Sequence, residues 1–434
     1  MAEINCKADD KGNSEAKRFY DDVRIIGTKG SEEFLEKVME FLFSGKLDNG
    51  KTITDANTNK NIYLRNLTAE QAKDKSIKGV VIDRFDTGEG KVTIHDSMRD
   101  VDLYIFADVF NYGATYTMYQ KERPMSPDEH YQDLLRIISA TAGKARRITV
   151  IMPMLYEGRQ HRRKARESLD CAMMLQELVH LGVDNILTFD AHDPNVQNAI
   201  PMSGFDNVHP TYQFIKALLN KVPDIILDEN HTMVISPDQG AMDRCIDVAH
   251  SLGSELGMFY KRRDYTRVVN GRNPILEHKY IGSSVKGKDV IIVDDMIASG
   301  ESTLDVAKKL KDEKANRVFI FATFGLFVKG LKKFDEAYER GDIDTVFTTN
   351  LIYTAPELEE RPWYQPVYLN KYVAMLIDTL SDNHSLSKLL TPSDRIDRYV
   401  TDWCQKHNQP TPEERRTAKA EADAAKPEVE AAKQ

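Results

Sequence analysis

The segment from residue 289 to 303, DVIIVDDMIASGEST, restricts the fold of this chain more than any other segment. Its apolar residues Val290 to Val293 predict a fully buried strand that stops at the carboxylates of Asp294 and Asp295. Small residues follow the acid pair, and a helix is predicted to begin at 301–303 because apolar residues then recur on one face. A buried strand that leads into a helix is typical of a parallel α/β sheet.

The same segment also has the chemistry of an anion site. The free backbone N–H groups of the small-residue loop and the positive end of the helix would face a phosphate. The two carboxylates beside the loop would engage hydroxyl groups or a metal ion. An ordinary strand-to-helix turn with a charged rim would show the same pattern, so both interpretations stand at this point.

The composition of the chain disfavours several classes of function. A formal net charge of −9 argues against nucleic acid as a partner, because binding to a phosphate backbone requires a basic surface. The longest mainly apolar run, Val318 to Val328, is far shorter than the roughly 20 residues of a membrane helix, so no membrane partner is expected. The N-terminus is polar, and the four cysteines are scattered without metal-like spacing. These features favour a cytoplasmic protein with reduced thiols.

The order of the predicted elements repeats within the 434 residues, which are enough for two domains. Strand-like runs within 102–109, 144–151 and 186–192 alternate with helical segments, and runs within 289–295, 314–321 and 346–352 do the same. The second run of each set, KARRITVI and KANRVFIF, also shares Lys-Ala-x-Arg. The predicted fold class is therefore α/β, with two tandem domains that each contain a mainly parallel sheet flanked by helices.

Domain boundaries are predicted from composition. Gly and Pro cluster at 201–210, so we assign residues 20–200 to an N-terminal domain and 201–400 to a C-terminal domain. The polar, turn-rich segment 45–78 is predicted to be a surface insertion and not part of the core. Residues 409–434 have almost no large apolar side chain and are predicted to be a disordered or frayed helical tail.

Polar residues at the ends of predicted strands are candidate ligand contacts, because ligands of open parallel sheets bind beyond the carboxyl ends of the strands. Asp190 and His192 follow the strand-like run 186–189. His192 is interpreted either as a metal ligand with a carboxylate neighbour or as a hydrogen-bonded structural residue. Asp238 follows another strand end, and a cap for the next helix explains it equally well.

Two basic clusters are candidate phosphate contacts in an otherwise acidic chain. Residues 159–163, RQHRR, bring four cationic or potentially cationic groups together, a composition that binds polyphosphates. Within 259–267, FYKRRDYTR, Lys261 and Arg263 would point the same way in an extended strand, toward one transferring phosphoryl group. Each cluster alone would also suit a solvated surface loop. Since the sequence has no GxGxxG motif, any ATP is not bound through that motif.

Together these motifs resemble those of the ribose-phosphate diphosphokinase family, also called phosphoribosyl-diphosphate synthetases. The segment 84–90, RFDTGEG, is predicted from its residues to be a hairpin turn, and it resembles the nucleotide-binding turn of the family. The resemblance runs from about residue 23 to 390 and implies two phosphoribosyltransferase-like domains. The motifs follow the order of the family: VRIIGTKGSEEFLEKVMEFL, RFDTGEG, MRDVDLYIF, RITVIMPMLYEGRQHRR, ILTFDAHDPNVQ, VISPDQGAMDR, VIIVDDM and YVAMLIDTLSDNHSLSKLL.

The resemblance implies a reaction in which ribose 5-phosphate receives the β,γ-diphosphoryl group of ATP, giving 5-phosphoribosyl 1-diphosphate and AMP. The anomeric hydroxyl attacks the β-phosphorus, with Mg²⁺ bridging the phosphates. Lys261 and Arg263 fall on the catalytic cations of the family. The resemblance places ATP at Phe85, Thr87, Glu89, Arg159, Gln160 and His161. It places the ribose hydroxyls at Asp294 and Asp295, the 5-phosphate along the loop Ala298, Ser299, Gly300, Glu301 and Ser302, and the metal at His192 and Asp238, with Asp190 nearby. A homo-oligomer built from dimers, often a hexamer, is also implied.

The chain departs from the pattern of the family at several of these positions. Ala298 lacks the carboxylate that is usual in the family, and Thr87 replaces the usual Asn. His161 stands where an acid is common. Glu301 is the departure with the largest physical consequence, because a carboxylate repels a bound phosphate unless it turns outward.

Two other functions remain open from the sequence. A catalytically silent paralogue could bind and regulate an active synthetase, although such a copy has no reason to keep Lys261, Arg263, His192 and Asp238. A phosphoribosyltransferase would consume the diphosphate product instead of making it. One such domain normally suffices for transfer, so the duplicated domains and the RQHRR cluster argue against this function.

Overall fold

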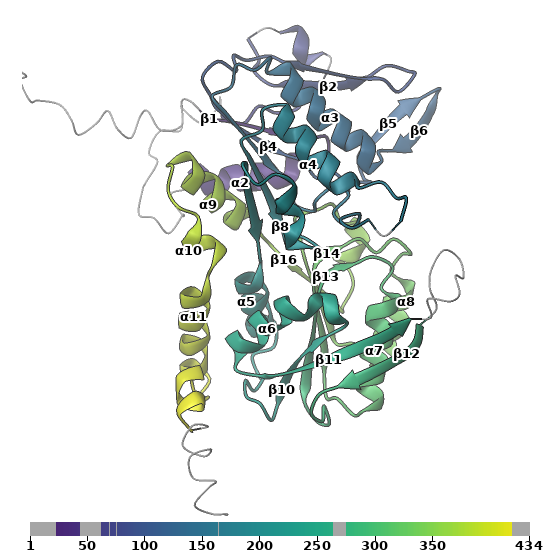
Figure 1. The fold of residues 1–434 in the computed structure, drawn as a ribbon, viewed down its shortest axis with the longest axis vertical. Coiled ribbons are helices and arrows are strands. Elements are labelled where there is room, and N and C mark those ends of the chain that lie inside the picture. Colours follow the sequence, from purple (N-terminus) through teal and green to yellow (C-terminus); the bar gives the residue numbers. More distant parts are fainter. Residues whose placement is uncertain are drawn as a thin grey trace, which may run out of the picture. The chain divides into compact units, whose positions relative to one another are not determined.

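The computed structural model describes residues 23–43, 62–68, 70–74, 76–163, 165–263 and 275–418, with the backbone alone at 261–263 and 275–278. The described chain forms two compact units (Figure 1). The first contains the described parts of 1–209 together with 350–353 and 368–390. The second contains 210–349, 354–367 and the residues from 391 on. Two short segments from the C-terminal half of the chain therefore belong to the first unit.

The first unit is built on a parallel sheet of five strands in the order β1-β4-β7-β8-β9. Leu103 and Ile105 face one side and pack with apolar residues of α3 and α4, while Tyr104 and Phe106 face α2 and α9. The strands are β1 (Val23–Gly27), β4 (Asp102–Phe106), β7 (Arg147–Ile151), β8 (Asn185–Phe189) and β9 (Gly204–Val208). The helices are α2 (Glu32–Phe43), α3 (Pro127–Ala140), α4 (Asp170–His180), α9 (Asn370–Ser381) and the short α10 (Ser387–Leu390).

Two hairpins extend this unit: β2 (Val80–Arg84) with β3 (Gly90–Ile94), and β5 (Thr115–Met118) with β6 (Lys121–Pro124). The first confirms the hairpin that the sequence predicts around RFDTGEG.

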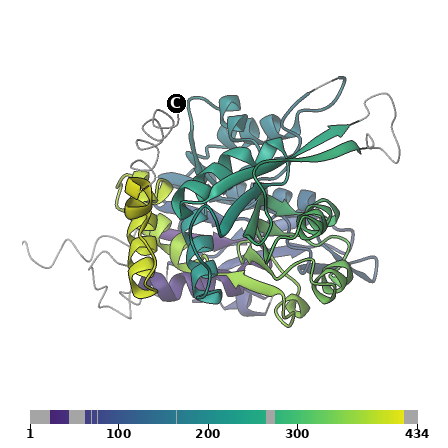
Figure 2. The same cartoon turned by 90° about the horizontal axis from the view of Figure 1, so that it is seen from below.

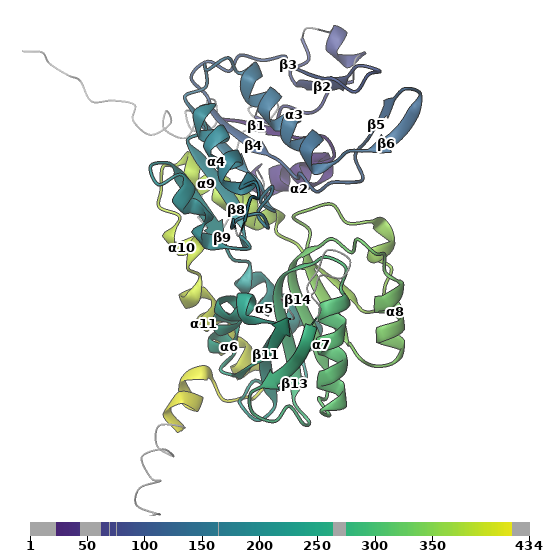
Figure 3. The ribbon, with the colours of Figure 1, turned by 45° about the vertical axis from the view of Figure 1, so that its right-hand side comes forward.

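The second unit contains a sheet of seven strands in the order β12-β11-β10-β13-β14-β15-β16. All pairs are parallel except β11–β12, which forms one edge of the sheet (Figure 2). Helices α7 and α8 cover one face, and α5, α6 and α11 lie on the other side (Figure 3). The strands are β10 (Thr232–Ser236), β11 (Glu255–Arg263), β12 (Ile275–Ile281), β13 (Asp289–Ile297), β14 (Val318–Gly325), β15 (Thr345–Thr349) and β16 (Tyr364–Val367). The helices are α5 (Thr211–Lys221), α6 (Met242–Leu252), α7 (Glu301–Asp312), α8 (Lys332–Glu339) and α11 (Ser393–Lys406).

The strand orders confirm the internal duplication. In the first unit the order is β1-β4-β7-β8-β9, and the corresponding order in the second is β10-β13-β14-β15-β16. In both sheets successive parallel strands are neighbours. The predicted fold class, two tandem α/β domains with mainly parallel sheets flanked by helices, is therefore the observed one.

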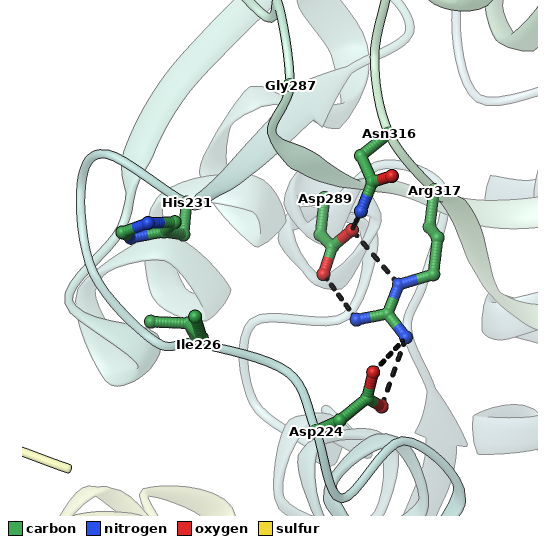
Figure 4. A pocket seen from close by; sticks show the side chains of 7 residues that line it. All are labelled: Asp224, Ile226, His231, Gly287, Asp289, Asn316 and Arg317. Atoms are coloured by element: carbon green, nitrogen blue, oxygen red, sulfur yellow. Dashed lines mark hydrogen bonds and ion pairs between the residues drawn. The ribbon is translucent and has the colours of Figure 1, made fainter.

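The repeated Lys-Ala-x-Arg has a physical role in both units. The Arg147 guanidinium binds Asp102 at 2.7 Å, and the Arg317 guanidinium binds Asp289 at 2.6 Å. Arg147 begins β7, and Arg317 directly precedes β14. Asp102 and Asp289 begin the neighbouring strands, so each pair ties two strands together at their amino ends. Arg317 also binds Asp224, and these residues line a pocket of about 380 Å³ (Figure 4).

Three expectations about boundaries differ from the structure. Strand β13 does not stop at the acid pair but continues to Ile297, because β14 is long enough to pair with Asp294, Met296 and Ile297. Part of the predicted surface insertion 45–78 is core: residues 62–64 are buried, and the Leu64 N–H donates to the carbonyl of Ile25. Residues 44–61 lie outside the described residues.

The predicted C-terminal tail is also ordered in its first part. Gln409 donates from its amide to the carbonyl of Ile225 at 2.7 Å, and Arg415 donates to that of Leu252 at 3.2 Å. These polar contacts dock residues 409–418 on the second unit without large apolar side chains. Residues 419–434 lie outside the described residues.

None of the described helices is long and apolar enough to cross a membrane. Cys171, Cys245 and Cys404 are buried free thiols.

The Arg317–Asp289 pair should carry a measurable part of the stability of the second unit. Arg317→Ala leaves the buried Asp289 carboxylate without its cation, and we expect the free energy of unfolding to fall by about 3 kcal/mol in urea denaturation. Arg340→Ala is the control, since the Arg340–Asp342 pair is more exposed and should contribute less than about 1 kcal/mol. Equal losses for the two variants would contradict this assignment.

Candidate active site

The polar residues selected from the sequence lie in two groups, one in each unit. In the first unit they follow β7 and β8, which are adjacent parallel strands, and they also occupy the β2–β3 turn. In the second unit they follow β10, occupy the end of the adjacent β13 and the loop after it, and lie along β11. Carboxyl ends of neighbouring parallel strands share one edge of a sheet, which is where ligands bind in folds of this kind.

The turn between β2 and β3 presents an exposed aromatic ring and a carboxylate. Phe85 is 58% exposed, although a phenyl ring of this size is usually buried. The Phe85 N–H donates to the carbonyl of Glu89 at 2.9 Å, and the Thr87 hydroxyl donates to the Glu89 carboxylate at 2.9 Å. Gly88 has a φ of +96°, which glycine adopts without strain. The turn is thus held by its own hydrogen bonds, with the ring of Phe85 open to a flat ligand.

The N-terminal half of α3 connects this hairpin to the basic segment after β7. Arg84, at the end of β2, forms a buried ion pair with Asp133 at 2.6 Å and also donates to the backbone carbonyl of Glu129. From the other side, the hydroxyl of Tyr156 donates to Asp128 at 2.7 Å, and its ring stacks on Tyr131. The β2–β3 turn and the basic segment are therefore both anchored to one helix.

The basic segment RQHRR is only partly available for a ligand. The ring of His161 binds the Asp193 carboxylate at 2.8 Å, and the Arg162 guanidinium binds the same carboxylate at 2.9 Å. Arg159 is exposed, and the side-chain amide of Gln160 donates to the backbone of Ser168. In the cluster, His161 and Arg162 are thus paired with Asp193, whereas Arg159 and Arg163 are exposed.

Asp193 also favours the charged form of His161. Burial, together with the charges of His192 and Arg162, lowers the pKa of His161 below its ordinary value, and the Asp193 carboxylate opposes this shift. The pKa of Asp193 is itself lowered, because hydrogen bonds from Asn195 and Arg162 outweigh its burial. The Asp193 carboxylate thus lies beside His161 as its partner.

The strand end at β8 carries the other candidates of the first unit. Asp190 is buried, has a φ of +42°, and lies 3.4 Å from the ring nitrogen of His209. His192 is exposed, and its ring lies 5.6 Å from that of His161 in an edge-on arrangement. A non-glycine residue with positive φ is uncommon, and such strain is often found at functional sites.

In the second unit, three carboxylates gather at the ends of β10 and β13. Burial, and after it the charge of Asp295, raises the pKa of Asp294 well above its ordinary value, and Asp238 adds to this shift. Arg244 on α6 opposes it. Asp238 also caps the following turn, since its side chain accepts from the Gly240 N–H at 3.0 Å. The capping role expected as one alternative for Asp238 is therefore present.

The loop after β13 is short and ends in a left-handed residue. Ala298, Ser299 and Gly300 join the strand to α7, and Gly300 has a φ of +75°. A Cβ atom at Gly300 would lie 2.3 Å from ring carbons of Phe334, so glycine is required by both backbone and packing. Helix α7 begins at Glu301, as the sequence predicts, and it has 12 residues. Its first N–H groups and its positive end lie beside the acid pair.

Glu301 turns toward two lysines. Its Oε1 atom lies 2.6 Å from the Nζ atom of Lys333 and 3.1 Å from that of Lys329. The carboxylate that would repel a phosphate is thus neutralised by cations that belong to the segment after β14.

The predicted catalytic cations lie on β11. Lys261 is paired with His278 across the β11–β12 ladder, and a register shift falls between Arg262 and Arg263. The side chains of Lys261 and Arg263 lie outside the described residues, so their predicted common direction stays a prediction.

The described residues fit a metal ion that is shared with its ligand and not one held by a protein cage. In the described part of the chain, no group of three or more His, Cys, Asp or Glu side chains is arranged to hold a metal. Mg²⁺ usually keeps several waters and takes one or two carboxylates together with substrate phosphates. The Asp238 carboxylate, beside the acid pair, offers such an oxygen.

The sequence does not predict three of the partners that shape these groups. Asp193 has no role in the predicted site, whereas its carboxylate binds His161. Lys329 and Lys333 follow Glu301 by 28 and 32 residues, too far for any local pattern. The only available signal was the Glu301 charge itself, which requires a counter-ion somewhere.

Comparison with known proteins gives matches over both units. Residues 23–182 match the family model of the N-terminal domain of ribose phosphate pyrophosphokinase, and residues 205–351 match that of the phosphoribosyl transferase domain. A ribose-phosphate pyrophosphokinase from Mycoplasma genitalium is 27% identical over 332 residues, which cover 76% of this chain and 89% of the relative. One from Shewanella oneidensis is 28% identical over 314 residues, covering 72% and 90%.

A solved structure shares the fold. The crystal structure of phosphoribosylpyrophosphate synthetase from Mycobacterium smegmatis aligns with a TM-score of 0.62 and 19% identity. The alignment covers 83% of this chain and 99% of that one.

The packing of Gly300 against Phe334 can be tested by substitution. Gly300→Ala adds a methyl group that clashes with the Phe334 ring, and it forces alanine into a positive φ. For both reasons we expect the free energy of unfolding to fall by about 3 kcal/mol or more. Gly341→Ala is a matched control, because Gly341 has a φ of +73° with no atom within 4 Å of the added Cβ. It should cost only the backbone strain, about 1–2 kcal/mol. Equal losses in urea denaturation would show that the ring contact is unimportant.

Proposed function

Because the chain belongs to the ribose-phosphate pyrophosphokinase family, we propose that it transfers the β,γ-diphosphoryl group of ATP to ribose 5-phosphate. The products are 5-phosphoribosyl 1-diphosphate and AMP. The observation that carries this proposal is the loop between β13 and α7, where two carboxylates stand beside the open N-terminus of a helix. That arrangement suits a sugar that carries both hydroxyl groups and a phosphate.

The second unit is proposed to hold ribose 5-phosphate. Asp294 and Asp295 accept hydrogen bonds from the ribose hydroxyls. Backbone N–H groups from Ser299 to Ser302 donate to the 5-phosphate, and the positive end of α7 favours its charge. The raised pKa of Asp294 supports this role, since a crowded carboxyl group gains most from new hydrogen-bond donors. Ala298 contributes no carboxylate, so the acid pair carries the hydroxyl contacts alone.

The first unit is proposed to hold ATP. The exposed ring of Phe85 offers a flat apolar surface to the base, and the Thr87–Glu89 pair supplies polar groups in the same turn. Arg159 is exposed and suits the phosphates, while Gln160 and His161 lie beside it. His161 is held by Asp193, so its role here is to position the segment more than to supply charge.

The proposed chemistry is an in-line displacement at the β-phosphorus. The oxygen of the anomeric hydroxyl attacks, the bond to the α-phosphate oxygen breaks, and AMP leaves with that oxygen. Lys261 and Arg263 are proposed to neutralise the charge that develops on the transferring group. Mg²⁺, when bound, would lower the charge of the phosphates, and His192, Asp190 and Asp238 are the residues proposed to hold it.

A silent regulatory copy and a phosphoribosyltransferase are the alternative functions. The ordered acid pair, the left-handed Gly300 and the neutralised Glu301 form an intact loop, which supports an active enzyme over a silent copy. Matches to both family domains over most of the chain support a synthetase over a single-domain transferase. A homo-oligomer built from dimers, possibly a hexamer, and a cytoplasmic location are further proposals from the family resemblance and the sequence.

The direct test is the formation of AMP by the purified chain. With ATP, Mg²⁺ and ribose 5-phosphate present, we expect AMP to appear, and omission of the sugar phosphate or addition of EDTA should abolish it. Well-folded protein that forms no AMP would overturn the proposed activity. Consumption of 5-phosphoribosyl 1-diphosphate that depends on a nitrogenous base and releases diphosphate would favour the transferase instead.

Lys261 can be tested against a neighbouring lysine on the same hairpin. Lys261→Ala should lower kcat by a factor of about 100 to 1,000 with the fold intact, because a cation at the transition state is lost. Lys279→Ala, on β12 and exposed, should leave turnover within about twofold. Near-normal turnover in Lys261→Ala would remove this residue from the mechanism.

A further inference from the structure

Glu301 is in a place where its charge should interfere with the ligand of the loop. It is the first residue of α7, and the adjacent N–H groups and the positive helix end attract any anion, including its own carboxylate. The 5-phosphate proposed for this loop would meet that carboxylate as a like charge.

The carboxylate is instead bound on its other side by two cations. Lys333, on α8, lies 2.6 Å from Oε1 of Glu301, and Lys329, in the loop before α8, lies 3.1 Å from the same atom. Hydrogen bonds from these two lysines lower the pKa of Glu301 to about 2, so the residue is ionised throughout the working range of an enzyme. The charge of Glu301 is therefore permanent and must be managed by its neighbours.

The segment that carries the lysines is fixed to the loop in other ways. The Leu326 N–H donates to the carbonyl of Ile297 at 2.9 Å, and the Val328 N–H donates to that of Ala298 at 2.9 Å. One turn further, Phe334 is buried against Gly300 and stacks on Trp363. The side chain of Trp363 in turn donates to Asp335 on α8 at 2.8 Å. These contacts fix the segment 326–335, and with it both lysines, next to the loop.

We propose that Lys329 and Lys333 are positioning residues for the sugar phosphate, which hold the Glu301 carboxylate away from the phosphate-binding N–H groups. This inference deepens the proposed function and rests on it. In their absence the carboxylate would be released toward the same N–H groups and helix end that bind the phosphate. It would then compete with the phosphate by occupancy and by repulsion, so the lysines would set the affinity for ribose 5-phosphate through Glu301.

A different role for the lysines gives a different result. If Lys329 and Lys333 attracted the phosphate directly as two positive charges, their loss would weaken binding whether or not Glu301 is charged. If they served only the fold, their loss would lower stability and affect both substrates. The dependence on the Glu301 charge distinguishes the positioning role from both.

The experiment is a mutant cycle on the full chain with ribose 5-phosphate kinetics. The Lys329→Gln/Lys333→Gln double variant should raise KM for ribose 5-phosphate about tenfold, with kcat and KM for ATP within about twofold. Adding Glu301→Gln to that variant should return KM most of the way to the original value. Lys332→Gln is the matched control, because Lys332 is on the same helix, is 88% exposed, and lies 3.9 Å from Glu336. It should change none of these constants.

Two outcomes would overturn the proposal: an unchanged KM in the double-lysine variant, or a raised KM that persists after Glu301→Gln. Calorimetric titration with ribose 5-phosphate, and with inorganic phosphate as a second probe, measures the same affinities without turnover. If the unaltered chain binds ribose 5-phosphate but forms no AMP, the proposed activity fails, and the same titrations still decide the role of the lysines.

Discussion

The N-terminus of α7 is the constraint on which the second unit depends. For its N–H groups to stay open, the chain must leave β13 in three residues and turn through a left-handed glycine. Glycine adopts this φ without strain, and Phe334 packs where the side chain of any other residue would be. That ring is held by Trp363 and Phe327, and so the geometry of the loop is fixed by the apolar core under α8. The carboxylates, the lysines and the helix end then take their positions from this packing.

The two units use one framework for different purposes. When β4 and β13 are aligned at Asp102 and Asp289, Asp108 corresponds to Asp295. In the first unit Asp108 accepts from the N–H groups of Tyr353 and Phe110, at 2.7 and 3.1 Å, and so it holds the segment 350–353. Burial raises the pKa of Asp108 to about 7 despite these bonds. In the second unit the equivalent position remains beside an open helix end. The duplicated acid is structural in one copy and is proposed to bind ligand in the other.

Much of this arrangement could be predicted from the sequence, for identifiable reasons. Periodicity and buried runs give the order of strands and helices, and small residues before Glu301 give the loop, because these signals are local. The predicted end of β13 was wrong. The charges of Asp294 and Asp295 predict the end of a strand, but pairing with β14 keeps both residues within it. Burial of Leu64 and docking of Gln409 depend on partners far along the chain. Lys329 and Lys333 could not be predicted as partners of Glu301 for the same reason, because a distant counter-ion leaves no local pattern.

The proposed transfer is tested most directly by ³¹P NMR of the reaction mixture, because the spectrum reports which phosphorus atoms move. With ATP, Mg²⁺ and ribose 5-phosphate, we expect AMP and a diphosphoryl group on the anomeric oxygen of the sugar phosphate, formed in equal amounts and without ADP. Formation of ADP with a singly phosphorylated sugar would show transfer of one phosphoryl group. That result would contradict the central claim that both phosphoryl groups pass together to the ribose bound at the loop before α7.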